Sequence, residues 1–264
     1  GPELKFEERW MPPTHVETPD APTKDMSITV GWNTAQAAGI TRAEMDAWAA
    51  RSHQRAVAAI DAGKFLDEIL PLKVAQLDGS VIDFSVDEHP RRDTTAEKLA
   101  ELKVLHPEIE GFSITAGNSS GTNDACAAVA VVDHAYAADK GLDVMATVKA
   151  WGAVGVAPRD TGLGGVEVIG KVLGRAGLKP SDVALWEINE AFASVPIAAC
   201  RRYGIDEELV NFSGSGCSLG HPIAASGARM VTTLVYELRR RGGGIGMAAM
   251  CAGGGQGGAV IIEV

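Results

Sequence analysis

The 264-residue chain lacks the features that mark several easily recognised classes of protein. No apolar run approaches the ~18 residues of a membrane span, and the start has neither the basic region nor the apolar run of a signal peptide. Its four cysteines form no CxxC pair, so neither a metal site nor a disulfide framework is predicted. Acidic residues outnumber basic ones by 34 to 24, and a net charge of −10 disfavours nucleic acid as a partner. We therefore expect a cytoplasmic protein with reduced thiols and no membrane span.

The chain does contain enough apolar sequence for a sizeable core. Hydrophobic residues make up 46% and charged residues 22%, which is typical of one large globular domain or two ordinary ones. In the second half, strand-like and helical patterns alternate, which predicts an α/β fold with helices on the faces of a sheet. The expected strands are 144–156, 183–188, 245–250 and 259–263, and the expected helices are 164–176, 192–203 and 221–240.

The first part of the chain has a mixed character. Residues 1 to about 24 have no clear period and are predicted to be irregular, and a short helix is expected between 29 and 39. Thr41 and Glu44 form a capping-box pattern that opens a longer helix, which we expect to end near Ala62. Two strands are then expected at 70–74 and 81–84, followed by a short helix after the basic stretch that begins at Arg91.

Three motifs follow strand-like runs in the second half. His221 lies between a glycine-rich approach and a proline that can open a helix. Asn189 begins the stretch Asn-Glu-Ala-Phe, and Cys251 precedes the glycines 253–255. Because sites in α/β sheets usually lie at the carboxyl ends of strands, we expect these three side chains to converge on one pocket. Taken alone, His221 would more often be a turn residue and Cys251 a small buried one; the three motifs together favour a functional role.

A loop of small residues at 114–124 leads into the apolar run 125–132. Small side chains let backbone N–H groups approach a ligand, although the same pattern is typical of a tight turn before a buried strand. The apolar run is predicted to be a strand with sheet neighbours on both sides. Cys126 and Cys200 are interpreted as core residues, and for Cys217 packing is favoured over a reactive role. Glu190 is interpreted as a structural carboxylate rather than a general base.

In this order and spacing the three motifs resemble the C-terminal half of a thiolase, a family of acyl-CoA acyltransferases. The stretch around Arg51-Ser52-His53-Gln54 is similar to the thiolase loop domain, a lid that covers the coenzyme. The resemblance implies a layered αβαβα fold with an inserted α+β loop domain. Residues 1–112 would form the lid, 113–140 the end of the N-terminal half and 141–264 the C-terminal half. The nucleophilic cysteine of a thiolase would precede Gly1, so acyl transfer is expected to need an N-terminal half from the same gene product or a separate chain.

The resemblance also implies roles for the residues that match. His221 would donate to an enolate oxygen, Asn189 would fix a water beside it, Cys251 would act as acid and base, and the Gly253 N–H would stabilise a second oxyanion. Coenzyme A and acyl-CoA would be substrates, with no prosthetic group. Ser120 would contact the pantetheine arm.

Two further features bear on the coenzyme. Near Met26, assigned to the coenzyme and acyl site, the family often has a flanking histidine and glycine; Asp25 and Ser27 stand there instead, which leaves the shape of the acyl pocket open. An acidic chain also needs a local basic patch to hold a polyanion. The candidates are Arg91, Arg92, Lys98 and Lys103.

The leading interpretation is an acyl-CoA C-acyltransferase of fatty acid metabolism. It would carry out thiolytic cleavage of 3-ketoacyl-CoA, or the reverse condensation of acetyl-CoA, as a homodimer or homotetramer. One alternative is a noncatalytic thiolase-like subunit that binds coenzyme A thioesters or serves as a scaffold, which would not need Asn189, His221 and Cys251. Another is a relative of the ketoacyl synthases, which usually carry a second histidine where Cys251 stands.

Overall fold

The computed structural model describes residues 14–264, so the first part of the segment expected to be irregular, residues 1–13, lies outside the described residues. Residues 14–24 consist of turns and one isolated bridge between Thr18 and Ala21, as expected of irregular chain. No helix within residues 14–264 has both the length and the apolar character needed to cross a membrane.

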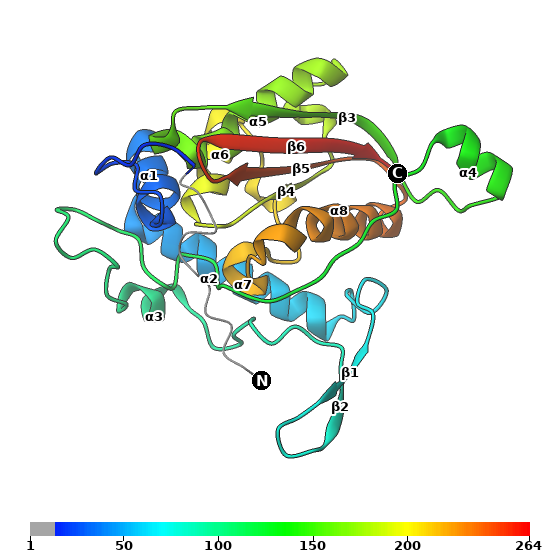
Figure 1. Cartoon of the computed structure of the whole chain (residues 1–264), viewed down its shortest axis with the longest axis horizontal. Coiled ribbons are helices and arrows are strands. Elements are labelled where there is room, and N and C mark those ends of the chain that lie inside the picture. The colour runs from blue at the N-terminus through cyan, green and yellow to red at the C-terminus, as the bar shows by residue number, and fades with distance from the viewer. Residues whose placement is uncertain (1–13) are drawn as a thin grey trace.

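A mixed sheet of four strands, in the order β3-β6-β5-β4, forms the centre of the fold (Figure 1). Strand β6 pairs antiparallel with both β3 and β5, and β4 pairs parallel with β5. The four strands predicted in the second half are therefore confirmed, with small shifts at their ends. Their bounds are Thr147–Gly155 for β3, Leu185–Ile188 for β4, Ile245–Ala252 for β5 and Gln256–Glu263 for β6.

Helices cover both faces of this sheet, as the alternation of strand-like and helical patterns in the sequence predicts. Helix α5 (Thr161–Ala176) lies on one face and α8 (Ile223–Arg240) on the other (Figure 1). Because successive side chains of a strand point to opposite faces, Met247 of β5 joins the core that includes α5, while Ala248 packs with Met230 of α8. Helix α6 (Ser194–Tyr203) also packs on α5 and adds to the same core.

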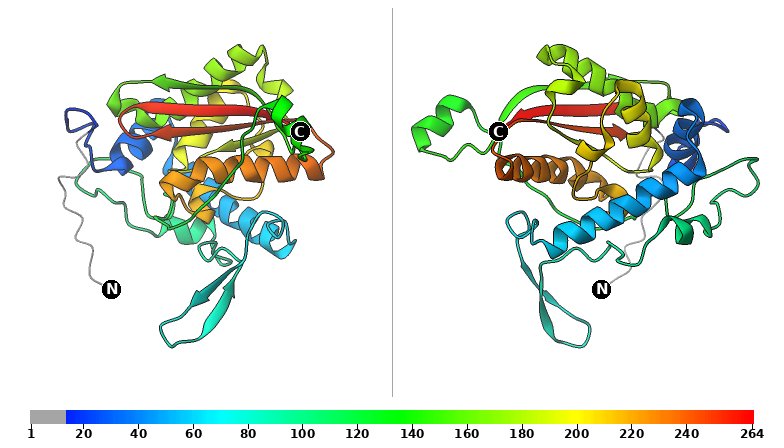
Figure 2. Two further views of the ribbon diagram at one scale, coloured as in Figure 1. Left: turned by 45° about the vertical axis from the view of Figure 1, so that its right-hand side comes forward. Right: turned by 180° about the vertical axis from the view of Figure 1, so that it is seen from behind.

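The first part of the chain packs against this unit. A π-helical turn (Ser27–Trp32) runs into α1 (Asn33–Ala38), and α2 (Arg42–Asp61) follows. Thr41 and Glu44 form the predicted capping box at the start of α2. Strands β1 (Leu72–Ala75) and β2 (Val81–Phe84) form a hairpin that projects from the body of the molecule (Figure 2). The described elements also include the short helices α3 (Ala96–Ala100), α4 (His134–Lys140) and α7 (Gly216–Leu219), and 3-10 turns at Pro158–Asp160, Pro180–Asp182 and Glu207–Leu209.

The strand predicted over residues 125–132 does not form, and Cys126, expected in the core, is exposed. The segment has no ladder partner among the described residues, and Val131 is 78% exposed. An apolar run becomes a strand only when neighbouring backbone supplies hydrogen bonds and a surface to cover it. Here the run crosses the molecule as extended chain and ends in α4 (Figure 1).

Candidate active site

Asn189 and His221, which are 32 positions apart in sequence, meet at the carboxyl end of β4. Asn189 follows the last residue of β4, and its N–H donates to the carbonyl of Ala249 in β5 (3.0 Å). Its Nδ2 lies 3.3 Å from Nε2 and 3.5 Å from Nδ1 of His221. The helix expected to begin at His221 begins at Ile223, so the histidine lies in the turn between α7 and α8.

The His221 ring is held by a second contact and by its surroundings. Nδ1 lies 2.6 Å from Oγ of Ser226, one turn into α8. Burial lowers the pKa of His221, with a further contribution from the positive charge of Arg229, so the imidazole is neutral at neutral pH. Oδ1 of Asn189 is buried without a hydrogen-bond partner among the described residues. A half-turn of the amide would bring Oδ1 toward the ring, so the pair can serve either tautomer of His221.

The loop of small residues at 114–124 reaches this pair. The N–H of Ser120 donates to the carbonyl of Ala191 (2.9 Å), and the carbonyl of Gly121 accepts from the N–H of His221 (3.1 Å). Gly220 has φ +92°, and a Cβ there would lie 2.0 Å from Oδ1 of Asn123. Only glycine fits at that point, so the turn that presents His221 depends on Gly220.

Cys251 lies at the same end of the sheet, near the end of β5, and its side chain points toward α5. Its Cβ is 3.4 Å from where a Cβ at Gly165 of α5 would stand, whereas the preceding Met250 reaches Gly227 of α8. No hydrogen bond joins Cys251 to Asn189 or His221 among residues 14–264. Burial raises the pKa of the Cys251 thiol to about 11. The structure thus joins Asn189 to His221 by direct contact, while the Cys251 side chain packs beside Gly165 of α5.

Gly253 lies in the turn that joins β5 to β6. The residue is exposed, and its carbonyl accepts from Nε2 of Gln256 (3.2 Å). Gly254 and Gly255 have φ of +82° and +84°, a left-handed conformation that requires glycine. The N–H of Gly255 donates to Oγ1 of Thr161 (3.0 Å), which fixes the turn against the start of α5.

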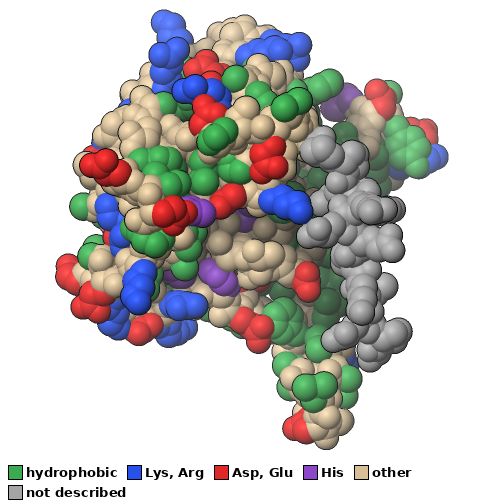
Figure 3. Space-filling view, turned by 60° about the vertical axis from the view of Figure 1, so that its left-hand side comes forward, with side chains coloured by type: hydrophobic (Ala, Val, Ile, Leu, Met, Phe, Trp, Pro, Cys, Tyr) green, Lys and Arg blue, Asp and Glu red, His purple; other side chains and the backbone are tan. Residues whose placement is uncertain are grey.

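The other residues predicted to bind the coenzyme lie in the first part of the chain, between Met26 and Lys103. Arg92 forms two hydrogen bonds with Asp61 (2.8 and 2.7 Å), and Nζ of Lys98 lies 2.8 Å from Oδ2 of Asp93. The backbone N–H of Arg91 donates to Nδ1 of His53 (3.1 Å). Basic and acidic side chains are interspersed on the face shown in Figure 3. Met26 packs partly buried against the main core.

Two buried carboxylates, Glu187 and Glu190, lie on either side of Asn189 in the sequence. Glu190, interpreted as structural, is 1% exposed and accepts four hydrogen bonds. The sequence patterns above do not point to Glu187, although it is a charge within the apolar run 183–188. It is fully buried, accepts from Arg229 (2.8 Å) and Ser215 (3.3 Å), and burial raises its pKa to about 7.

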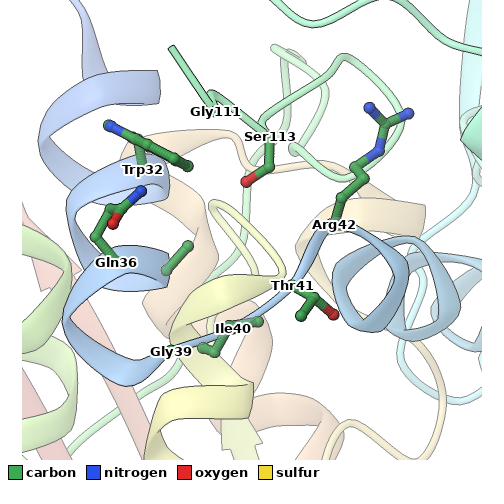
Figure 4. A pocket seen from close by; sticks show the side chains of 9 residues that line it. Trp32, Gln36, Gly39, Ile40, Thr41, Arg42, Gly111 and Ser113 are labelled. Atoms are coloured by element: carbon green, nitrogen blue, oxygen red, sulfur yellow. The ribbon is translucent and has the colours of Figure 1, made fainter. Parts of the chain in front are cut away.

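A separate cavity of about 260 Å³ lies at the junction of α1 and α2. Trp32, Gln36, Arg42 and Ser113 are among its lining side chains (Figure 4). None of the predicted site residues lines it, so this cavity is distinct from the end of β4 where Asn189 and His221 meet.

Two family models match the chain: "Thiolase, N-terminal domain" over residues 18–135 and "Thiolase, C-terminal domain" over residues 142–264. The acetyl-CoA acetyltransferase of Pseudomonas aeruginosa is 44% identical over 232 residues, which are 88% of this chain and 58% of that protein. The solved structure of the Bacillus anthracis acetyl-CoA acetyltransferase has a TM-score of 0.81 at 41% identity, covering 88% of this chain and 58% of that one. A structure of human mitochondrial 3-ketoacyl-CoA thiolase in complex with CoA has a TM-score of 0.79 at 37% identity, covering 88% and 57%. The chain spans a little more than half the length of these relatives.

Proposed function

This chain belongs to the thiolase family and has its α/β fold, and from that premise we propose that it supplies one part of the active site of an acyl-CoA C-acyltransferase. The reaction would be thiolytic cleavage of 3-ketoacyl-CoA or the reverse condensation of acetyl-CoA. The observation that carries the proposal is the Asn189 and His221 pair, joined at 3.3 Å beside the loop that contains Ser120.

The chemistry needs donors for an enolate oxygen and a group that exchanges a proton with the α-carbon. When Ser226 donates to Nδ1 of His221, Nε2 carries the proton and serves as the donor, with Asn189 holding a water beside it. In thiolysis the nucleophile of the N-terminal half would take the acyl group as the bond between the α- and β-carbons breaks, and the carbanion would take a proton from Cys251. Coenzyme A would then accept the acyl group, and its thiol proton would return to Cys251. A thiol with a pKa of about 11 holds that proton at neutral pH. This proposal requires a substrate that lies across the carboxyl ends of the neighbouring strands β4 and β5, beside Asn189 and Cys251, and the Gly253 N–H would stabilise the second oxyanion.

The proposal extends to the ligand and the assembly. Ser120 would contact the pantetheine arm, Met26 would border the acyl chain, and Arg91, Arg92 and Lys98 would bind the phosphates of coenzyme A. Residues up to 112 would act as the lid, 113–140 would complete the N-terminal half and 141–264 would form the C-terminal half. We place the enzyme in the cytoplasm as a homodimer or homotetramer. Its acyl transfer would use the nucleophile of an N-terminal half.

The decisive experiment is complementation. The 264-residue chain is incubated with acetoacetyl-CoA and coenzyme A, with and without the N-terminal half of the Pseudomonas aeruginosa relative made as a separate chain. We expect acetyl-CoA only when both are present, and its loss in His221→Ala but not in the matched control His134→Ala, which alters an exposed histidine of α4. Coenzyme A binding without turnover in the complemented sample would favour the noncatalytic alternative. Turnover by the chain alone, with an acyl label on Cys217, would overturn the proposal that an N-terminal half supplies the nucleophile.

The basic cluster has its own test. Neutralising Arg91, Arg92 and Lys98, singly and in pairs, is expected to weaken coenzyme A binding and flatten its dependence on salt, because a phosphate contact is screened by ions. Two of these cations already pair with Asp61 and Asp93, so the loss is expected to be largest for Arg91. Binding that is unchanged in every variant would remove the cluster from the site.

A further inference from the structure

The Glu190 carboxylate accepts four hydrogen bonds from two separate parts of the chain. Its Oε1 accepts from Nε1 of Trp48 (2.8 Å) and Nδ2 of Asn211 (2.7 Å). Its Oε2 accepts from Oγ of Ser52 (2.7 Å) and the N–H of Cys217 (3.1 Å). The indole, amide and backbone groups can only donate, so this environment is built for a group that only accepts.

The partners of Glu190 connect the lid to the loop that presents His221. Trp48 and Ser52 lie one turn apart on α2, while Asn211 and Cys217 belong to the segment 211–221. The contact with α7 is also tight in the backbone, because a Cβ at Gly216 would lie 2.4 Å from the carbonyl oxygen of Glu190. Helix α7 therefore rests directly on residue 190, and only the turn at Gly220 separates it from His221.

Asn211 fixes the backbone at the start of the segment 211–221, which carries His221. It is the one residue other than glycine with a positive φ (+50°) among residues 14–264. Its side chain exchanges two hydrogen bonds with the backbone of Ile188, both at 2.9 Å, in addition to the bond to Glu190. The segment that carries His221 is thus tied to β4 on one side of Asn189 and to Glu190 on the other.

From these contacts we propose that Glu190 is a positioning residue, which couples the docking of α2 to the geometry of the Asn189 and His221 pair. Asn189 is its neighbour in sequence, and His221 follows α7, which Glu190 holds through Cys217. A displacement of α2 that breaks the contacts of Glu190 with Trp48 and Ser52 would therefore loosen Asn189 and His221 together. The catalytic meaning of this coupling rests on the proposed function, whereas the coupling itself rests on the hydrogen bonds of Glu190 alone.

The test follows the His221 ring by NMR, in the complete chain and without substrate. In Glu190→Gln, an NH₂ group must face two donors, α7 loosens, and water reaches His221. We expect the pKa of His221 to rise toward its ordinary value of about 6.5. Trp48→Phe, which removes one donor, should shift it the same way by less, and should add nothing in the Glu190→Gln background. Glu237→Gln is the matched control: this carboxylate is also buried, at 4% exposed, but it binds Lys64, Arg240 and Arg241 at the far end of α8.

The outcomes separate this inference from the proposed function. An unchanged His221 titration in Glu190→Gln, or a shift of equal size in Glu237→Gln, would overturn the coupling whatever the enzyme does. If Glu190→Gln does not fold, the milder Trp48→Phe and Ser52→Ala decide the question, and a His221 titration like that of the parent chain in both would again overturn it. Absence of turnover in the complemented parent chain would end the proposed function and leave the NMR result standing. With activity present, Glu190→Gln is expected to lower kcat while the KM for coenzyme A stays the same.

Discussion

Strand β5 and the segment 125–132 are both apolar runs that predict strands, yet only one of them is a strand. Strand β5 has β4 on one side and β6 on the other, and Met247 and Ala249 are almost fully buried. The segment 125–132 has no ladder partner within the described residues, and Val129 and Val131 are 47% and 78% exposed. An apolar run therefore predicts a strand only where neighbouring strands are present to pair with it and cover its side chains.

The largest expected difference between the two segments is in hydrogen exchange. Amides of β5 are expected to exchange at least about a thousandfold more slowly than unprotected amides, because they open only with the whole sheet. Amides of 125–132 should exchange close to the unprotected rate. Mass spectrometry of peptic fragments from one sample measures both. Slow exchange in 125–132 that persists at high dilution would show that the segment has a partner within the chain.

Truncation of one side chain in each segment sharpens the comparison. Met247→Ala removes a fully buried side chain and is expected to lower the free energy of unfolding by about 2 to 5 kcal/mol. Val131→Ala, its counterpart, should change that free energy by less than about 0.5 kcal/mol. Urea denaturation gives both values. Equal losses in the two variants would contradict the assignment of 125–132 as unpartnered.

Glu187 of β4, the strand beside β5, is expected to make the free energy of unfolding depend on pH. Burial raises the pKa of Glu187 from 4.5 in the unfolded chain to about 7 in the folded one, so the folded state binds this proton more tightly. The resulting stabilisation is complete below about pH 4.5 and is lost as the pH rises through about 7, by up to about 3 kcal/mol. The difference in unfolding free energy between the parent chain and Glu187→Gln is therefore expected to change across this window. A difference that is constant from pH 4.5 to 8 would show that Arg229 keeps Glu187 charged throughout.

The smallest change in unfolding free energy is expected at β3, the strand at the outer edge of the sheet. Unlike the segment 125–132, β3 has side chains hydrogen-bonded to its backbone carbonyls. Nζ of Lys171 donates to the carbonyl of Ala153 (2.6 Å), and Nη1 of Arg175 donates to the carbonyl of Trp151 (2.7 Å). These side chains occupy carbonyls that another strand would use. Lys171→Ala should lower the unfolding free energy by less than about 0.5 kcal/mol and increase self-association in sedimentation velocity. A larger loss would mean that this contact supports the core rather than the edge.

Much of the fold was decided locally and was therefore visible in the sequence. The capping box at Thr41 and Glu44 is confirmed because both partners lie within one turn of helix. The strands and helices after residue 144 follow their apolar periods, since their neighbours lie in the same 120 or so residues and satisfy them. The three motifs also placed Asn189 and His221 together, because both follow elements that end at one edge of the sheet.

The tertiary structure alone decided three other matters. It left 125–132 and Cys126 exposed, since the pattern of a segment says nothing of whether a partner is present. It turned Cys251 toward α5, because the side of a strand to which a residue points depends on its register with β6. It also gathered Trp48, Ser52, Asn211 and Cys217 around Glu190, with partners up to 142 positions apart. Contacts at such separations depend on how whole elements pack, and no local pattern in the sequence encodes that packing.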